Sequence, residues 1–385
     1  MFFVSRWQQS GEPDKIRLIE LGPGRGTLLC DMLRTFANFP KLFSSLRTLQ
    51  MVEASPMLLM EQEKALSSTL ERYGKKLVSA EKPVEQLAPN EIRAEWFPSY
   101  HNVPVDPTYW TLVTAHEFFD ALPVHIFERR LEGWRELMVD VTDLGTRAGG
   151  VTTYKASELL AGKQKQQEKE AGLRFVLSPQ ATPWTKLLVV QNDRFDGVQP
   201  GQRVEVSPLS WTIARRMGEW ISGYEALKAT PDNRVAPLSP EEEQRRAAPS
   251  RGGCGLVVDY GDAHWFGESF RAFKAHKLVD PLEHPGSSDL TANVDFQYLN
   301  NAVASTDARG YGLLSQRDLL MLLGLQLRVQ KLVEQNPGRA QEIEGAAKRL
   351  VDSTSMGTQY KALCVSAPSV PHAGIEPNEE IYPFL

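Results

Sequence analysis

The stretch Ile19-Glu20-Leu21-Gly22-Pro23-Gly24-Arg25-Gly26-Thr27 decides the fold of this chain. It completes an apolar run that begins at Ile16, and apolar residues at helical spacing follow it. The order strand, tight turn, helix is typical of α/β folds. Glycine suits the turn because it has no Cβ, so the backbone can bend sharply and approach a ligand closely.

The spacing of the glycines indicates the class of ligand. A dinucleotide-binding loop follows the pattern G-x-G-x-x-G, with its third glycine at a helix N-terminus. Here Gly22, Gly24 and Gly26 form G-x-G-x-G, and Thr27 occupies the position of the third dinucleotide glycine. Glu20, two residues before Gly22, suits a cationic ligand better than a phosphate. This combination resembles the first motif of Rossmann-like S-adenosylmethionine (AdoMet) methyltransferases; a plain structural turn is the alternative reading.

A second predicted strand also ends in a carboxylate. The run from Thr48 leads to Glu53, and Ser55 and Pro56 then match the cap and first turn of a helix. In doubly wound folds an acid at the tip of the second strand accepts hydrogen bonds from ribose hydroxyls. The position of Glu53 therefore favours nucleoside binding, and a solvated glutamate at a strand end is the alternative.

A further pair of acids follows the predicted strand that starts at Trp110. Glu117 and Asp120 are three residues apart, so they would share one side of a helical turn if the segment coils there. Carboxylates that follow a strand in a doubly wound sheet face the ligand crevice. The alternative is that Asp120 caps a turn and Glu117 is solvated.

Composition is that of a globular protein. The chain has 385 residues, of which 42% are hydrophobic and 24% charged. A net charge of −5 argues against nucleic acid as the main partner. The sequence predicts no membrane span, since no apolar run approaches about 20 residues. It predicts no metal site either, because its three cysteines are far apart and match no zinc spacing.

Two later segments differ from the strand and helix patterns. Residues 230–253 are rich in proline and charge, and we expect a mobile surface loop there. Residues 284–296 combine turn residues, hydroxyls and acids, among them Asp289 and Asp295. This composition fits a binding loop and an ordered cap equally well.

Five motifs together resemble the MidA-like family. They begin at Glu20 (ELGPGRGT), Val52 (VEASP), Glu117 (EFFDALP), Val258 (VDYG) and Asp289 (DLTANVDF), and they occur in the order of that family. The resemblance runs from about residue 12 to residue 366. The mitochondrial members of the family are protein arginine methyltransferases that assist assembly of respiratory complex I.

The resemblance implies a Rossmann-like class I methyltransferase fold of the α/β class. Its sheet would be mostly parallel and seven-stranded, with an antiparallel last strand. We expect a discontinuous core over 12–122 and 204–366, an inserted β-rich substrate-side region over 123–203, and a C-terminal tail over 367–385. The resemblance further implies AdoMet as cofactor, type II activity (symmetric dimethylation of arginine), a core subunit of complex I as the protein substrate, and the mitochondrial matrix as location. It leaves the oligomeric state open.

Roles for the candidate residues follow from the chemistry of arginine methylation. Glu20, Gly22, Gly24 and Gly26 would hold the methionine end of AdoMet, with Glu53 and Ser55 at the ribose. A guanidinium is always protonated and a poor nucleophile, so carboxylates must grip it and accept a proton. Glu117 and Asp120 are the first candidates for this task. Asp289 and Asp295 are substrate-side candidates.

The chain also departs from the family. Relatives carry an upstream segment with helices beside the cofactor, and we expect this chain to be truncated there, without a transit peptide and with its activity in doubt. His116 replaces a common asparagine, and Asn293 a common histidine. Two alternatives to an arginine methyltransferase stay open, namely a non-catalytic AdoMet-binding assembly chaperone and a small-molecule methyltransferase. The inserted region 123–203 favours a protein substrate over a small one.

Overall fold

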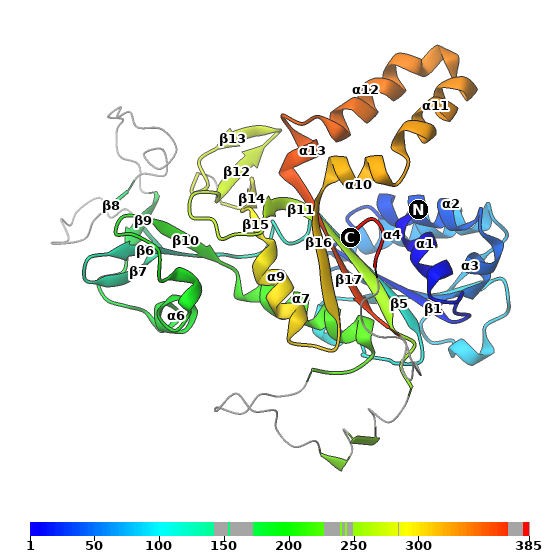
Figure 1. Cartoon of the computed structure of the whole chain (residues 1–385), viewed down its shortest axis with the longest axis horizontal. Coiled ribbons are helices and arrows are strands. Elements are labelled where there is room, and N and C mark those ends of the chain that lie inside the picture. The colour runs from blue at the N-terminus through cyan, green and yellow to red at the C-terminus, as the bar shows by residue number, and fades with distance from the viewer. Residues whose placement is uncertain are drawn as a thin grey trace. The chain divides into compact units, whose positions relative to one another are not determined.

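A computed structural model describes residues 1–141, 153–154, 172–226, 239–240, 243–244, 249–283, 285–368 and 380–384. The chain divides into two compact units (Figure 1). The first unit comprises Met1–Phe118, Thr212–Gly261 and Leu299–Leu385. The second comprises Phe119–Trp211 and Asp262–Tyr298. Each unit is described by itself.

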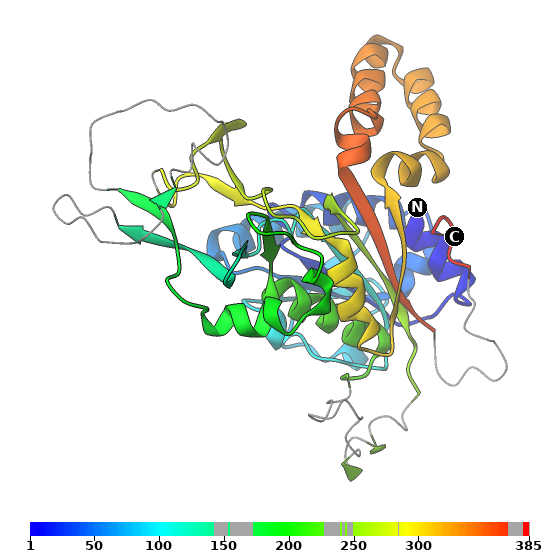
Figure 2. The same cartoon turned by 60° about the vertical axis from the view of Figure 1, so that its left-hand side comes forward.

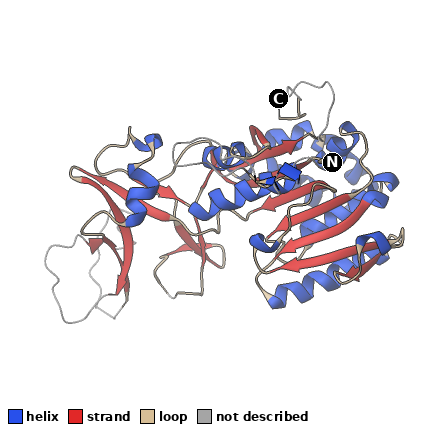
Figure 3. Cartoon of the chain, turned by 90° about the horizontal axis from the view of Figure 1, so that it is seen from below, coloured by secondary structure: helices blue, strands red, loops and turns tan. Residues whose placement is uncertain are grey.

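The first unit is built on a sheet with the strand order β16-β17-β11-β5-β1-β2-β4-β3. Figure 3 shows strands of this sheet side by side, with helices packed along them. Strands β11, β5, β1, β2, β4 and β3 pair in parallel, whereas β17 is antiparallel to both β11 and β16. The bounds are β1 Ile16–Leu21, β2 Leu46–Val52, β3 Lys76–Ser79, β4 Glu91–Phe97, β5 Trp110–His116, β11 Gly253–Asp262, β16 Arg309–Ser315 and β17 Tyr360–Ala367. This confirms the predicted Rossmann-like sheet with its antiparallel last strand, and β3 is an additional strand at one edge.

Helices cover both faces of this sheet, which explains why every residue of β1 is buried. On one face, alternate strand residues such as Leu18 and Leu112 share a core cluster with Phe3 on α1, Leu33 on α2 and Leu319 on α10. On the other face, Arg17 donates a hydrogen bond to the backbone carbonyl of Trp220 on α7. The bounds are α1 Phe2–Gln9, α2 Thr27–Phe36, α3 Pro40–Ser45, α4 Pro56–Glu71, α7 Pro208–Ser222, α9 Phe296–Ala304, α10 Gln316–Leu322, α11 Leu325–Gln335, α12 Ala340–Val351 and α13 Met356–Gln359.

Helices α11 and α12 form a hairpin between β16 and β17 (Figure 2). Neither helix contains a buried residue. Gly324, with φ of 85°, separates α10 from α11 because a left-handed residue ends the helical path. The hairpin therefore adds no side chain to the core of the sheet.

The second unit is rich in antiparallel strands. One sheet has the order β10-β6-β7-β9-β8, and a smaller one has the order β13-β12-β14. Apolar side chains such as Phe127, Trp134 and Val204 form one of its buried clusters. The bounds are β6 His125–Arg130, β7 Gly133–Val141, β8 Thr153–Tyr154, β9 Leu173–Leu177, β10 Arg203–Val206, β12 Arg271–Lys274, β13 Lys277–Val279, β14 Asp289–Thr291 and β15 Val294–Asp295, with the short helix α6 at Pro183–Thr185.

Parts of three predicted segments lie outside the described residues. These are residues 142–152 and 155–171 of the predicted inserted region 123–203, most of the predicted mobile loop 230–253, and residues 369–379 and 385 of the predicted tail. Near the end of the chain, Ile381 and Phe384 are buried and belong to the core cluster of the first unit. None of the helices formed by the described residues is long and apolar enough to cross a membrane.

Candidate functional site

The glycine loop joins β1 to α2 in the first unit. Gly22, Gly24 and Gly26 all have positive φ, of 60°, 54° and 75°, which other residues adopt only with strain. A Cβ at Gly22 would lie 2.8 Å from a ring carbon of Phe118, so glycine is needed there for close packing as well. The backbone N–H of Gly22 donates to the carbonyl of Val52 at 3.1 Å, which ties the loop to the end of β2.

Glu20 is a buried carboxylate beside this loop. Its side chain is 3% exposed, and Oε2 has no hydrogen-bond partner among the described residues. Burial raises the pKa of Glu20 from 4.5 to about 8, because water no longer solvates the charged form. A cationic group placed here would pair with the carboxylate and restore its charge. The donor set therefore fits the ammonium or sulfonium end of AdoMet.

Glu53 and Ser55 lie at the end of β2. One oxygen of Glu53 accepts a hydrogen bond from the backbone N–H of Ser55 at 2.8 Å, and the other accepts from Gln62 at 3.1 Å. Ser55 caps α4, since its hydroxyl accepts from the N–H of Leu58 at 3.4 Å. The carboxylate is thus held in a fixed orientation and keeps further lone pairs for ribose hydroxyls.

Gln62 connects the two parts of this site, although nothing in the sequence pattern distinguishes it. It is fully buried on α4. Its Nε2 donates to the carbonyl of Gly24 at 2.6 Å and to Oε2 of Glu53 at 3.1 Å, and its Oε1 accepts from Nε1 of Trp96 at 2.8 Å. Periodicity places Gln62 in a helix but does not reveal which backbone carbonyl it meets. The structure therefore brings the loop and Glu53 together through a residue that sequence reasoning missed.

Glu117 follows the carboxyl end of β5 and is exposed. The segment after β5 forms bends and a turn, so the helical turn considered for Glu117 and Asp120 is absent. Glu117 has φ of 49°, in the left-handed region. Its N–H donates to the carbonyl of Val258, and one of its carboxylate oxygens accepts from the hydroxyl of Tyr360 at 2.6 Å. Glu117 thus lies at the carboxyl edge of the sheet, one residue before Phe118, which packs on Gly22.

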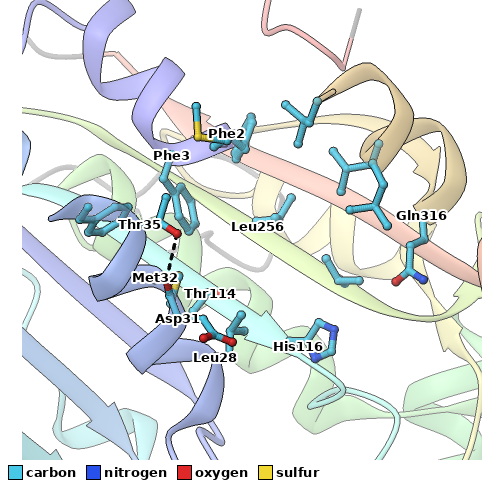
Figure 4. A pocket seen from close by; sticks show the side chains of 16 residues that line it. Phe2, Phe3, Leu28, Asp31, Met32, Thr35, Thr114, His116, Leu256 and Gln316 are labelled. Atoms are coloured by element: carbon cyan, nitrogen blue, oxygen red, sulfur yellow. Dashed lines mark hydrogen bonds between the residues drawn. The ribbon is translucent and has the colours of Figure 1, made fainter. Parts of the chain in front are cut away.

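A cavity of about 330 Å³ opens in the first unit among α1, α2, α10 and the strands β5 and β11 (Figure 4). Most of its lining is apolar, including Phe2, Phe3, Leu28 and Leu256. Asp31, Thr114, His116 and Gln316 add polar atoms to the wall. Thr114 pairs in register with Glu20, so the candidate donor site and the cavity share neighbouring strand residues.

The remaining candidate acids lie in the second unit. Asp120 accepts a hydrogen bond from the hydroxyl of Thr291 at 2.7 Å. Asp289 is exposed on β14. Asp295 pairs with Arg194 at 2.8 Å and accepts from the N–H of Tyr298 at 3.0 Å at the start of α9. Within the described part of the chain, no group of three or more His, Cys, Asp or Glu side chains could hold a metal ion.

Comparison with known families gives one match that covers most of the chain. Residues 1–313 match the model of a family described as S-adenosyl-L-methionine-dependent methyltransferases. Curated relatives are named "Protein arginine methyltransferase NDUFAF7, mitochondrial". The protein from Xenopus tropicalis is 30% identical over 94% of this chain and 70% of its own length. The human protein is 29% identical over 94% of this chain and 68% of its own length.

Two solved structures from Burkholderia thailandensis have a similar fold. One was crystallised with S-adenosyl-homocysteine and has a TM-score of 0.66 at 18% identity, covering 95% of this chain and 74% of its own. The other, an uncharacterised protein of the same superfamily, has a TM-score of 0.64 at 18% identity, covering 95% and 77%. At this identity the likeness concerns the fold alone.

Proposed function

This chain belongs to the family of S-adenosyl-L-methionine-dependent methyltransferases, and on this premise we propose that it methylates arginine in a protein. The observation that carries the proposal is the position of Glu117. An exposed carboxylate follows the carboxyl end of β5 and directly precedes Phe118, which contacts the glycine loop. The names of the curated relatives support the same activity.

The chain's own residues account for binding of the methyl donor. When bound, AdoMet supplies a methyl group on a sulfonium, which is already electrophilic. The loop Gly22–Gly26 lets the backbone approach it closely. Glu20 would pair with its cationic end, and Glu53, oriented by Gln62 and by the N–H of Ser55, would accept hydrogen bonds from the ribose. Ser55 contributes through its backbone, since its hydroxyl caps α4.

Glu117 would act on the acceptor. A guanidinium stays protonated at neutral pH, and its charge is spread over three nitrogens. A carboxylate that accepts hydrogen bonds from it orients the nucleophilic nitrogen in line with the methyl group. When that nitrogen gains a carbon it must lose one proton, and Glu117 is the group we assign to receive it. The new N–C bond replaces the S–CH3 bond, whose electron pair stays on the sulfur as a neutral thioether. The methylated guanidinium keeps one positive charge and Glu117 ends as the neutral acid, so atoms and charge balance.

We propose different roles for the three candidate acids of the second unit. Asp120 is the second candidate for the guanidinium, and its contact with Thr291 would fix its carboxylate. Asp289 is exposed and stays a substrate-side candidate. For Asp295 the ion pair with Arg194 and the bond to Tyr298 support a structural role instead.

We further infer the finer activity from the family resemblance. The product would be symmetric dimethylarginine, the substrate a core subunit of respiratory complex I, and the location the mitochondrial matrix. The curated relatives are named mitochondrial, which supports the organelle.

Mass spectrometry after incubation with AdoMet and purified complex I subunits tests the proposal. We expect a gain of two methyl groups on one arginine, and amino-acid analysis then separates the symmetric from the asymmetric product. Binding of S-adenosyl-homocysteine without methylation of any protein would favour the non-catalytic assembly chaperone. Methylation of small metabolites alone would favour the small-molecule enzyme.

A further inference from the structure

Two tyrosines lie next to Glu117 in the structure. Tyr260 is part of the VDYG motif that begins at Val258, whereas Tyr360 belongs to no motif used above. Tyr360 is the first residue of β17 and is the register partner of Tyr260 on β11. Because β17 runs antiparallel to β11, its first residue lies at the carboxyl end of β11. This is the edge of the sheet at which Glu117 follows β5. The antiparallel strand β17 thus places the phenol of Tyr360 next to the carboxylate of Glu117.

The contacts form a continuous chain of hydrogen bonds. The hydroxyl of Tyr360 lies 2.6 Å from Oε1 of Glu117 and 2.5 Å from the hydroxyl of Tyr260. A phenol carries one proton, so when Tyr360 donates to Glu117 it accepts from Tyr260. The two rings are 4.1 Å apart and tilted by 41°, which holds both hydroxyls in place.

Tyr360 is a buried hydrogen-bond donor to Glu117. Its side chain is 1% exposed. Burial, followed by the neighbouring Glu117 carboxylate, raises the pKa of Tyr360 far above its ordinary value. The phenol therefore keeps its proton at neutral pH and donates it to the hydrogen bond with Glu117.

We propose that Tyr360 is a positioning residue for methyl transfer, and that it acts by holding one oxygen of Glu117 so that the other meets the guanidinium. The inference rests on the proposed function. The left-handed backbone conformation of Glu117 sets the direction in which its side chain leaves the main chain. The hydrogen bond from the Tyr360 hydroxyl then holds the carboxylate at the other end of that side chain. Without the phenol the carboxylate would sample several rotamers and fewer of them would be productive.

The test compares Tyr360→Phe with Tyr109→Phe in the full chain. Tyr109 is also buried in the first unit, but it precedes β5 and so lies at the opposite end of that strand from Glu117. We expect Tyr360→Phe to lower kcat for arginine methylation about tenfold, as for loss of a hydrogen bond to a charged group. The affinity for S-adenosyl-homocysteine should stay within about twofold of wild type. Tyr260→Phe should have a smaller effect in the same direction.

A carboxyl-carbon NMR spectrum at neutral pH gives a readout that is independent of activity. The Glu117 resonance is assigned by its loss in Glu117→Gln. Because the Tyr360 hydroxyl donates to this carboxylate, we expect the resonance to change its chemical shift in Tyr360→Phe and to stay unchanged in Tyr109→Phe.

Each outcome decides between the two proposals. If wild type methylates arginine while Tyr360→Phe matches Tyr109→Phe in kcat and in the Glu117 resonance, the positioning role is wrong and the proposed function stands. If wild type methylates no arginine, the proposed function fails and the positioning role fails with it, even where the Glu117 resonance changes.

Discussion

Nε2 of Gln62 donates a hydrogen bond of 2.6 Å to the backbone carbonyl of Gly24, so a buried residue of α4 fixes the loop that follows β1. The same nitrogen lies 3.1 Å from Oε2 of Glu53. The two halves of the candidate cofactor site are therefore coupled through one amide. Trp96 holds the other end of that amide at 2.8 Å, which leaves it little freedom to turn.

Replacing Gln62 with leucine should weaken cofactor binding. The volume is nearly kept, but Gly24, Glu53 and Trp96 all lose their partner. We expect S-adenosyl-homocysteine to bind at least tenfold more weakly by calorimetry, with a loss of about 1–3 kcal/mol in the free energy of unfolding. Gln50→Leu is a matched control. Gln50 lies on β2 and is also buried, and its Nε2 donates to Oε2 of Glu95 at 2.6 Å. Equal loss of affinity in both variants would contradict a specific role for Gln62.

Gly24→Val should abolish binding of S-adenosyl-homocysteine. The structure shows open space around a Cβ at Gly24, so the variant can fold, but the branched side chain would occupy the space that the ligand needs. Gly74→Val controls for backbone strain, because Gly74 has φ of 70° and equally open surroundings after α4. We expect both variants to melt at lower temperature and only Gly24→Val to lose binding. If Gly24→Val binds S-adenosyl-homocysteine as well as wild type does, the glycine loop is not part of the cofactor site.

The sequence predicts the fold of the first unit well because its signals are local. The apolar run Ile16–Leu21 is β1 itself, and Ser55 caps α4 as its residue type suggests. The edge strand β3 gave no comparable signal, since it is four residues long and partly exposed. A short strand of this kind forms through pairing with β4, which is a tertiary interaction.

The candidate site was only partly predictable. The residue type of Gly22, Gly24 and Gly26 indicates a sharply turning backbone, and all three have positive φ. Gln62 and Tyr360 gave no signal, because Gln62 meets Gly24 across 38 residues of sequence and Tyr360 meets Glu117 across 243. The segment of Asp295 fits a binding loop and an ordered cap equally well. Its partner Arg194 lies 101 residues earlier and cannot be seen from the local pattern.

Glu20 should give the stability of the free protein a specific pH dependence. Its pKa is about 8 in the folded protein and 4.5 in the unfolded chain. Between these values the folded protein keeps a proton that the unfolded chain has lost. The contribution of Glu20 to the free energy of unfolding is therefore complete below about pH 4.5 and is lost as the pH rises through about 8. Over this range the free energy of unfolding falls by up to about 1.4 kcal/mol per pH unit. Denaturant titrations from pH 5.5 to 8.5 should show wild type losing stability relative to Glu20→Gln, and parallel curves would contradict this.

The same carboxyl group should release a proton when the ligand binds. Near pH 7 the free protein holds Glu20 largely protonated, and an ammonium group beside it would favour the ionised form. Calorimetry of S-adenosyl-homocysteine in two buffers of different ionisation enthalpy measures that proton. We expect release in wild type and none in Glu20→Gln. Equal heats in both buffers for wild type would place the ligand's cationic group away from Glu20.

Asp295→Asn should act on stability rather than on turnover. The guanidinium of Arg194 is partly buried, and the substitution removes the negative charge that pairs with it. We expect a loss of about 1–3 kcal/mol in the free energy of unfolding, measured by chemical denaturation. Turnover per folded molecule should be kept, and the exposed Asp289 provides a comparison, since Asp289→Asn should cost little stability. A large fall in turnover with stability intact would return Asp295 to the substrate site.

Glu117→Gln tests the centre of the proposed mechanism. The amide keeps the shape of the side chain, but it neither balances the charge of a guanidinium nor accepts the proton that methylation releases. We expect arginine methylation to fall by at least a hundredfold while the affinity for S-adenosyl-homocysteine changes little, because Glu20 and Glu53 hold the donor. Asp120→Asn should show a smaller fall if Asp120 is the second acid. If Glu117→Gln loses donor binding and turnover in equal measure, Glu117 belongs to the donor site, and another group must take the proton from arginine.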